Sequence, residues 1–236
     1  MTDSPEPHPV VGEPILLSYI YHLLAVGFKY PTCESFEYLQ SGQFMRDLFT
    51  YFIVLPHLSS VAVEEMPVIE KVYGDLKKID FRSFETKYVR AFDAGFPEPP
   101  CPPYEGVYAE KATKMETMME VSEFYRHFGL IMNQSMGKRE LPDYLCAELE
   151  FMHFLALKEA QAGEGNQAEL LNGYILAQKD FLERHFINWF PKFHEKVLGV
   201  HDLPFYPDLA RITLRYINSE YGRVSKLAEK ETALVS

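Results

Sequence analysis

The chain has 236 residues, of which 47% are apolar, and its formal net charge at pH 7 is −11. This length suits one large domain or two small ones, and the apolar content is sufficient for a buried core. The acidic balance argues against a nucleic-acid partner, because phosphate binding needs clustered lysine and arginine side chains. It fits a cationic partner, and it fits simple solubility equally well.

The cysteines and the N-terminal segment indicate the compartment. Cys33, Cys101 and Cys146 are widely spaced, so neither a disulfide framework nor a zinc site is expected. Residues 1–13 are polar and lack the basic start and apolar stretch of a secretory signal. No run approaches the roughly 18–20 apolar residues of a membrane span. We therefore expect a cytoplasmic protein in which residues 1–13 form a flexible tail.

Helical periodicity dominates the chain from Pro14 onward, and no segment alternates with the period of a strand. Ser41 and Gly42 are expected to break one helix, and Pro67 is expected to kink or restart another. The expected helices cover 15–30, 36–55, 61–76, 81–92, 109–128, 142–162, 170–182, 189–198 and 208–221, with a polar connection at 133–140. This pattern predicts an all-α, single-domain bundle of about eight to ten helices over 14–222, followed by a flexible tail over 223–236.

A proline-rich loop separates the helix that ends at Phe92 from the next one. Five of the seven residues from Pro97 to Pro103 are prolines, which fix φ and donate no backbone hydrogen bonds. Such a stiff loop presents Tyr104 and Glu105 at a defined place and loses little entropy on binding. It is either a preorganised contact for a peptide or a rigid connector that packs on the domain.

The helix that follows Pro142 is apolar on most of its sides but still carries carboxylates. Leu145, Leu149 and Met152 share one face, which places this helix in the middle of a bundle. Carboxylates near a core must find partners or become neutral. Glu148 therefore either takes part in binding or reaches a salt bridge, while Asp143 also suits the positive end of the helix dipole.

Two further patterns have simple structural explanations. Glu150 and His153 form an E-x-x-H step, but a ferritin-like di-iron site needs a second such step and two more glutamates. No second E-x-x-H occurs, so we expect neither a metal nor another cofactor, and His153 is expected to be a satisfied helix histidine. The methionines at 115, 118 and 119 could form a flexible peptide-binding face, although a core stripe is the simpler expectation.

The ordered motifs resemble those of the TorD/DmsD/NarJ family, helical chaperones that mature molybdenum redox enzymes. The resemblance rests on Tyr88-Val89-Arg90-Ala91-Phe92, Pro102-Pro103-Tyr104-Glu105-Gly106, Glu140-Leu141-Pro142-Asp143-Tyr144 and Glu148-Leu149-Glu150-Phe151-Met152. Here glycine stands for the family's serine at 106, and Tyr144 stands for its histidine. These variants are similar to those of chaperones that serve dimethylsulfide, ethylbenzene, selenate or chlorate enzymes.

The resemblance implies a non-catalytic, cytoplasmic chaperone with a TorD-like fold. Its expected partner is the twin-arginine signal or the apo form of a molybdopterin oxidoreductase catalytic subunit, which it helps through cofactor insertion and export proofreading. The peptide-binding residues that we infer are Tyr88, Phe92, Pro103, Tyr104, Glu105, Asp143, Tyr144 and Glu148. In this hypothesis the aromatic rings bury the apolar part of the leader, while the carboxylates face its arginines. The chain is expected to be a monomer or a weak or domain-swapped dimer.

Two other readings stay open at this point. One is a helical adaptor or assembly protein that binds a folded partner without recognising a signal peptide. The other is a metal-dependent helical enzyme, which would need titratable groups converging in one pocket. No familiar catalytic motif, such as H-E-x-x-H, G-x-S-x-G or a P-loop, occurs in the sequence, which favours a protein that is not an enzyme.

Overall fold

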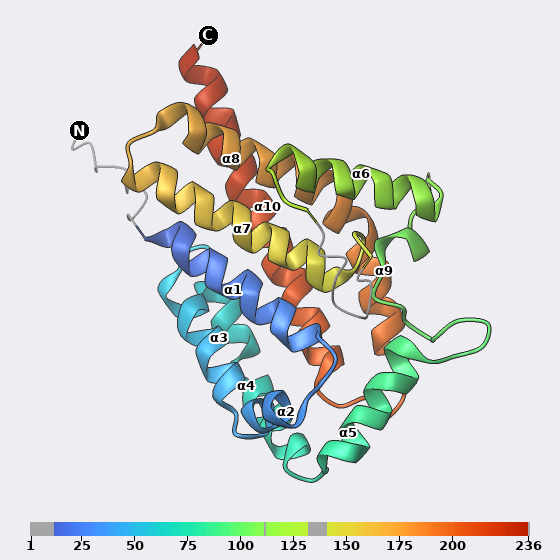
Figure 1. Ribbon diagram of the computed structural model, residues 1–236. Coiled ribbons are helices and arrows are strands. Elements are labelled where there is room, and N and C mark those ends of the chain that lie inside the picture. The colour runs from blue at the N-terminus through green and yellow to red at the C-terminus, as the bar shows by residue number, and fades with distance from the viewer. Residues whose placement is uncertain (1–11, 111, 132–140, 236) are drawn as a thin grey trace.

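The structure, a computed structural model, describes residues 12–110, 112–131 and 141–235 (Figure 1). All regular elements within these residues are helical, which confirms the predicted all-α class. The α-helices are α1 (Glu13–Phe28), α2 (Cys33–Gln40), α3 (Gln43–Val54), α4 (Ser59–Leu76), α5 (Phe81–Tyr88), α6 (Lys114–His127), α7 (Leu145–Glu164), α8 (Ala168–Phe181), α9 (Ile187–Leu198) and α10 (Tyr206–Val235). Short π-helical segments η1 (Val89–Asp93) and η3 (Leu182–Phe186) and the 3-10 turn η2 (Glu105–Val107) complete them.

Several helices begin or end at residues whose own conformational or capping preferences explain the boundary. Gly42 separates α2 from α3 with φ of +74°, a left-handed conformation that glycine adopts without a steric penalty. The Asp80 carboxylate accepts the Ser83 backbone N–H at 2.7 Å and caps α5. Pro14 lies in the first turn of α1, where its missing N–H costs no helical hydrogen bond.

Two helices differ from the expectation. α4 continues through Pro67 without a restart. Because proline has no N–H, the carbonyl of Val63 loses its helical donor. Val63 is 70% exposed, so water can replace that donor. α6 begins at Lys114 rather than near 109, because Thr113 and Glu116 form a reciprocal capping box. The connection expected over 133–140 lies outside the described residues.

The centre of the bundle is the pair α1 and α7, which run side by side in opposite directions (Figure 1). Their shared face buries Leu17, Leu24, Leu149 and Met152 completely. α3 and α8 pack on the outer sides of this pair, and α10 packs on both α8 and α9. None of the described helices is long and apolar enough to cross a lipid bilayer.

The C-terminal segment corrects one boundary. We expected a flexible tail from residue 223, but α10 continues to Val235 and buries Val224 completely. The reason is an ion pair that the sequence pattern does not reveal: the Arg223 guanidinium binds both oxygens of Glu159 on α7, at 2.9 and 3.1 Å. At the other end α1 begins at Glu13, and the rest of the expected N-terminal tail, residues 1–11, lies outside the described residues.

Candidate functional site

The two motif-bearing stretches meet in the structure. Tyr104 and Tyr144 form an isolated antiparallel bridge, in which the Glu105 N–H donates to the Asp143 carbonyl at 2.9 Å. The Leu145 N–H donates to the Pro103 carbonyl, also at 2.9 Å. The proline-rich loop is thereby fastened to the first turn of α7, and the prolines leave it little freedom to move away. We call this contact the junction, meaning residues 101–108 together with 141–148.

The aromatic pair at the junction is the part of the predicted site that reaches solvent. The rings of Tyr104 and Tyr144 lie 5.4 Å apart and both residues are partly exposed, whereas Pro103 is buried. Partly exposed tyrosine rings suit an amphipathic partner, because they offer an apolar face together with a hydroxyl group. Pro103 holds the loop in place.

The Glu105 carboxylate turns inward to a histidine. His185 lies in the π-helical segment η3, and its Nδ1 is 3.0 and 2.9 Å from the two oxygens of Glu105. The side chains of His185 and Glu105 are only 1% and 7% exposed. π-helical turns are often found where a side chain has to be re-aimed, and here the turn joins α8 to α9 and brings His185 to the junction. No motif in the sequence indicated a role for this histidine.

Glu148 lies at the centre of the junction and is completely buried. Burial, and after it the negative charge of Glu105, raise the pKa of Glu148 well above its usual range. The Trp189 indole N–H donates to its Oε2 at 3.0 Å, which partly offsets this rise. Glu148 is therefore a buried acid with a raised pKa, and the indole N–H of the buried Trp189 is its hydrogen-bond donor.

Asp143 fills the remaining space between loop and helix. It is 3% exposed and accepts the Gly106 N–H at 3.1 Å, while burial raises its pKa. A Cβ atom on Gly106 would lie 2.9 Å from the Asp143 carboxylate and 3.0 Å from the Cα of Lys114. The family motif has serine at this position. Glycine therefore allows the backbone at 106 to lie this close to the Asp143 carboxylate and to the backbone of Lys114.

The expected orientation of the three carboxylates is wrong for this structure. We expected Glu105, Asp143 and Glu148 to face the arginines of a leader, but all three are at most 5% exposed. The reason is that each has an internal donor that makes burial tolerable, namely His185, Gly106 and Trp189 respectively. Their contact with a peptide stays a prediction.

Tyr88 and Phe92 also lie in the core, each 4% exposed. The Tyr88 hydroxyl donates to the Phe28 carbonyl at 3.1 Å, and the Phe92 ring lies 5.0 Å from those of Tyr88 and Tyr206. These residues support the end of α5 beneath the loop. Among the eight predicted site residues, only Tyr104 and Tyr144 are more than marginally exposed.

Two cavities open along α6, on the side of α8 and α9. The smaller, about 430 Å³, reaches the junction and is lined by Glu105, Tyr108, Glu110, Thr117, Trp189 and Lys192, among others. The larger, about 620 Å³, lies between α6 and α8. Its lining combines the apolar side chains of Phe124, Phe128 and Leu176 with the acids Glu120, Glu123 and Asp180 and the bases Lys179 and Arg184. Glu120 and Arg184, which form an ion pair, line both cavities. We call the two cavities together the α6 groove.

The methionines of α6 are not the core stripe that we expected. Met115 is 62% exposed and Met119 is 56% exposed. Their register explains this, because the residues of α6 that point inward are Thr117, Val121 and Tyr125. The surface of α6 is therefore rich in flexible thioether side chains, which recur on peptide-binding surfaces.

Comparison with known proteins identifies the family. Residues 58–195 match the model of the family described as nitrate reductase delta subunit. The chain is 32% identical to the perchlorate reductase assembly chaperone protein of Dechloromonas aromatica, over 89% of this chain and 90% of that protein. It is 33% identical to the chlorate reductase assembly chaperone protein of Ideonella dechloratans, over 49% and 58%, and 26% identical to the chaperone protein TorD of Vibrio cholerae, over 54% and 56%. The chain therefore belongs to the family of NarJ and TorD, as its motifs indicated.

Proposed function

We propose that this protein is an assembly chaperone for the catalytic subunit of a molybdenum-containing oxidoreductase. The observation that carries the proposal is the 32% identity, over 89% of the chain, to the perchlorate reductase assembly chaperone protein. The junction is consistent with it, because the residues that form it belong to the motifs that resemble those of the family. In this role the protein acts in the cytoplasm, is not an enzyme, and holds the apo-subunit until its cofactor is inserted.

The α6 groove is the surface that best fits a client leader. Twin-arginine leaders join a basic segment to an apolar one. In the lining of the larger cavity, Phe124, Phe128 and Leu176 would contact the apolar segment, and Glu123 and Asp180 would contact the basic segment. Glu120 already binds the guanidinium of Arg184, so an arginine of the leader could take the place of Arg184 there.

The test of the function is maturation of the client. The catalytic subunit is expressed with and without the chaperone in the same strain, and its molybdenum content and activity are measured. We expect the subunit made without the chaperone to contain little cofactor. In the strain that has the chaperone, we expect the subunit to copurify with it. Equal cofactor content in both preparations would rule out the chaperone role. Binding to the folded, cofactor-loaded subunit alone would point to an adaptor instead.

The test of the groove is a charge reversal at Glu123. This carboxylate is 69% exposed and its closest cation, on Arg126, is 3.9 Å away, so Glu123→Lys should leave the fold intact. We expect the variant to bind an Arg-Arg leader peptide about three- to tenfold more weakly, because an exposed charge pair contributes up to about 1 kcal/mol and reversal adds repulsion. Isothermal titration at low salt measures the affinity.

The matched control is Glu70→Lys, which makes the same change in charge on the exposed face of α4, away from the groove. Its affinity for the peptide should stay within about twofold of the unchanged protein, with the small loss coming from the altered net charge. If both variants lose affinity equally, the leader is attracted by overall charge and the α6 groove is not its binding site.

A further inference from the structure

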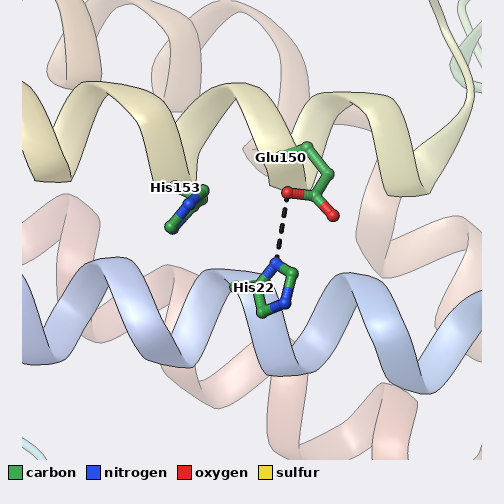
Figure 2. A group of neighbouring side chains, drawn as sticks. All are labelled: His22, Glu150 and His153. Atoms are coloured by element: carbon green, nitrogen blue, oxygen red, sulfur yellow. Dashed lines mark hydrogen bonds and ion pairs between the residues drawn. The ribbon is translucent and has the colours of Figure 1, made fainter.

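Three potential metal ligands lie together on the side of α7 that packs on α1. His22 projects from α1, and Glu150 and His153 project from α7, with one ligand atom of each lying within 4.8 Å of the others. In Figure 2 the His22 ring and the Glu150 carboxylate point toward each other across the gap between the helices, and His153 lies beside them. All three side chains are at least partly accessible to solvent.

The spacing of these groups approaches that of a metal site. His22 Nδ1 lies 3.3 Å from Glu150 Oε2, and two ligands of a tetrahedral ion with bonds of about 2.0–2.1 Å are roughly 3.4 Å apart. The rings of His22 and His153 have their centroids 5.3 Å apart, close to the roughly 5 Å that two imidazoles on one such ion require. Side-chain rotations of small amplitude would therefore bring the third ligand into range.

His153 is also held in the manner of a metal ligand. Its Nδ1 lies 2.9 Å from the carbonyl oxygen and 2.8 Å from the hydroxyl oxygen of Ser18, a residue that is 1% exposed. An Nδ1–H that donates to this carbonyl fixes the tautomer in which Nε2 carries the lone pair. Histidines that bind metals are usually oriented by such a hydrogen bond from the other ring nitrogen.

We propose that His22, Glu150 and His153 bind a divalent zinc ion, with water at the fourth position. Two imidazoles and one carboxylate with an open position form a known type of zinc coordination, and the same ligands would also accept nickel or copper. The absence of a second E-x-x-H excludes a di-iron site but not this one, because the third ligand comes from a helix 128 residues away in the chain. The ion would join the two central helices at their solvent-facing edge.

One neighbouring group opposes the ion. Lys29 Nζ lies 2.8 Å from Glu150 Oε1, so its positive charge is close to the metal position and partly neutralises the only anionic ligand. It also orients the carboxylate with Oε2 toward His22. Removal of the Lys29 charge should therefore strengthen zinc binding at this cluster. Zinc bound by an ordinary surface histidine elsewhere would not respond to this change.

The test uses the full chain, stripped of metal with a chelator and titrated with Zn²⁺ by calorimetry. We expect one ion to bind, and His22→Asn to weaken binding by at least the roughly 10–100-fold that loss of even an outer-shell partner causes. The His22 side chain is 47% exposed, so this variant should fold normally, which circular dichroism checks. Lys29→Met should bind Zn²⁺ more tightly than the unchanged protein.

The matched control is His201→Asn, which removes an exposed histidine remote from the cluster in sequence and should leave the affinity unchanged. A second readout is the visible absorption of bound Co²⁺, which should have the intensity of a tetrahedral site and should disappear in His22→Asn. Equal Zn²⁺ affinities for His22→Asn and His201→Asn would overturn the proposal, as would the absence of any binding by the unchanged protein.

Discussion

Replacing Arg223 with methionine should lower the free energy of unfolding by about 3–5 kcal/mol, because it removes the cation that two buried carboxylates share. The Arg223 side chain is only 10% exposed, and those of Glu159 and Glu220 are 4% and 0% exposed. The guanidinium binds Glu159 with two parallel hydrogen bonds and donates from Nε to Glu220 at 3.1 Å. These two carboxylates raise the pKa of Arg223 further, against the effect of burial.

Urea unfolding at pH 7 measures this effect, and Arg126→Met is the matched control. Arg126 is 67% exposed and forms only a 3.9 Å pair with Glu123, so its loss should cost less than about 0.5 kcal/mol. Adding Glu159→Gln to Arg223→Met should recover part of the lost stability, because it removes the buried Glu159 charge that Arg223 had neutralised. A loss in Arg223→Met no larger than that in Arg126→Met would show that this ion pair does not anchor α10.

Replacing His57 with asparagine should remove about 2 kcal/mol of stability near pH 6, and that difference should shrink steadily toward pH 9.5. Burial acts to lower the pKa of His57, but hydrogen bonds and charge from Glu13 and Glu220 override it and raise the pKa to about 9. His57 Nδ1 lies 3.1 Å from Glu13 and Nε2 lies 2.6 Å from Glu220.

The direction of the pH dependence follows from the raised pKa of His57. A histidine whose pKa is higher in the folded protein than in the unfolded chain stabilises the fold fully below about 6.5, the unfolded value, and stops doing so as pH rises through about 9. The slope cannot exceed about 1.4 kcal/mol per pH unit, and the 22% exposure of the His57 side chain reduces the total by solvent screening.

Unfolding curves of both proteins between pH 6 and 9.5 give this difference directly. Glu13→Gln provides the comparison, because removing one of the two carboxylates should move the loss of stability to lower pH while leaving the histidine in place. Parallel stability profiles for the unchanged protein and His57→Asn over this range would mean that His57 is not held charged between Glu13 and Glu220.

Local signals in the sequence were sufficient for much of the helical layout. Gly42, the Asp80 cap and Pro14 each act on their own turn of the chain, so their effects could be read without knowledge of the fold. The capping box of Thr113 and Glu116 is equally local, and a closer inspection of that T-x-x-E spacing would have placed the start of α6 correctly. The continuity of α4 through Pro67 depends on the exposure of Val63, which is a tertiary property.

In the candidate site, too, some features could be predicted from local sequence and others depend on the tertiary structure. The ordered motifs at 102–106, 140–144 and 148–152 indicated one functional region, and the structure joins the first two of them through the Tyr104–Tyr144 bridge. The inward orientation of Glu105 and Glu148 could not be predicted, because it depends on His185 and Trp189, which are 80 and 41 residues away from them in the chain.

By itself, the sequence determined the all-α class, most helix positions, the family and the two stretches that form the junction, since these depend on periodicity, capping and motif order within short segments. Only the tertiary structure decided which charges are buried, where α10 ends, and that His22 joins Glu150 and His153. The physical reason is that the pairing of polar side chains is a through-space property of helix faces, and helices α1, α7 and α10 contribute partners that lie more than 60 residues apart in the chain.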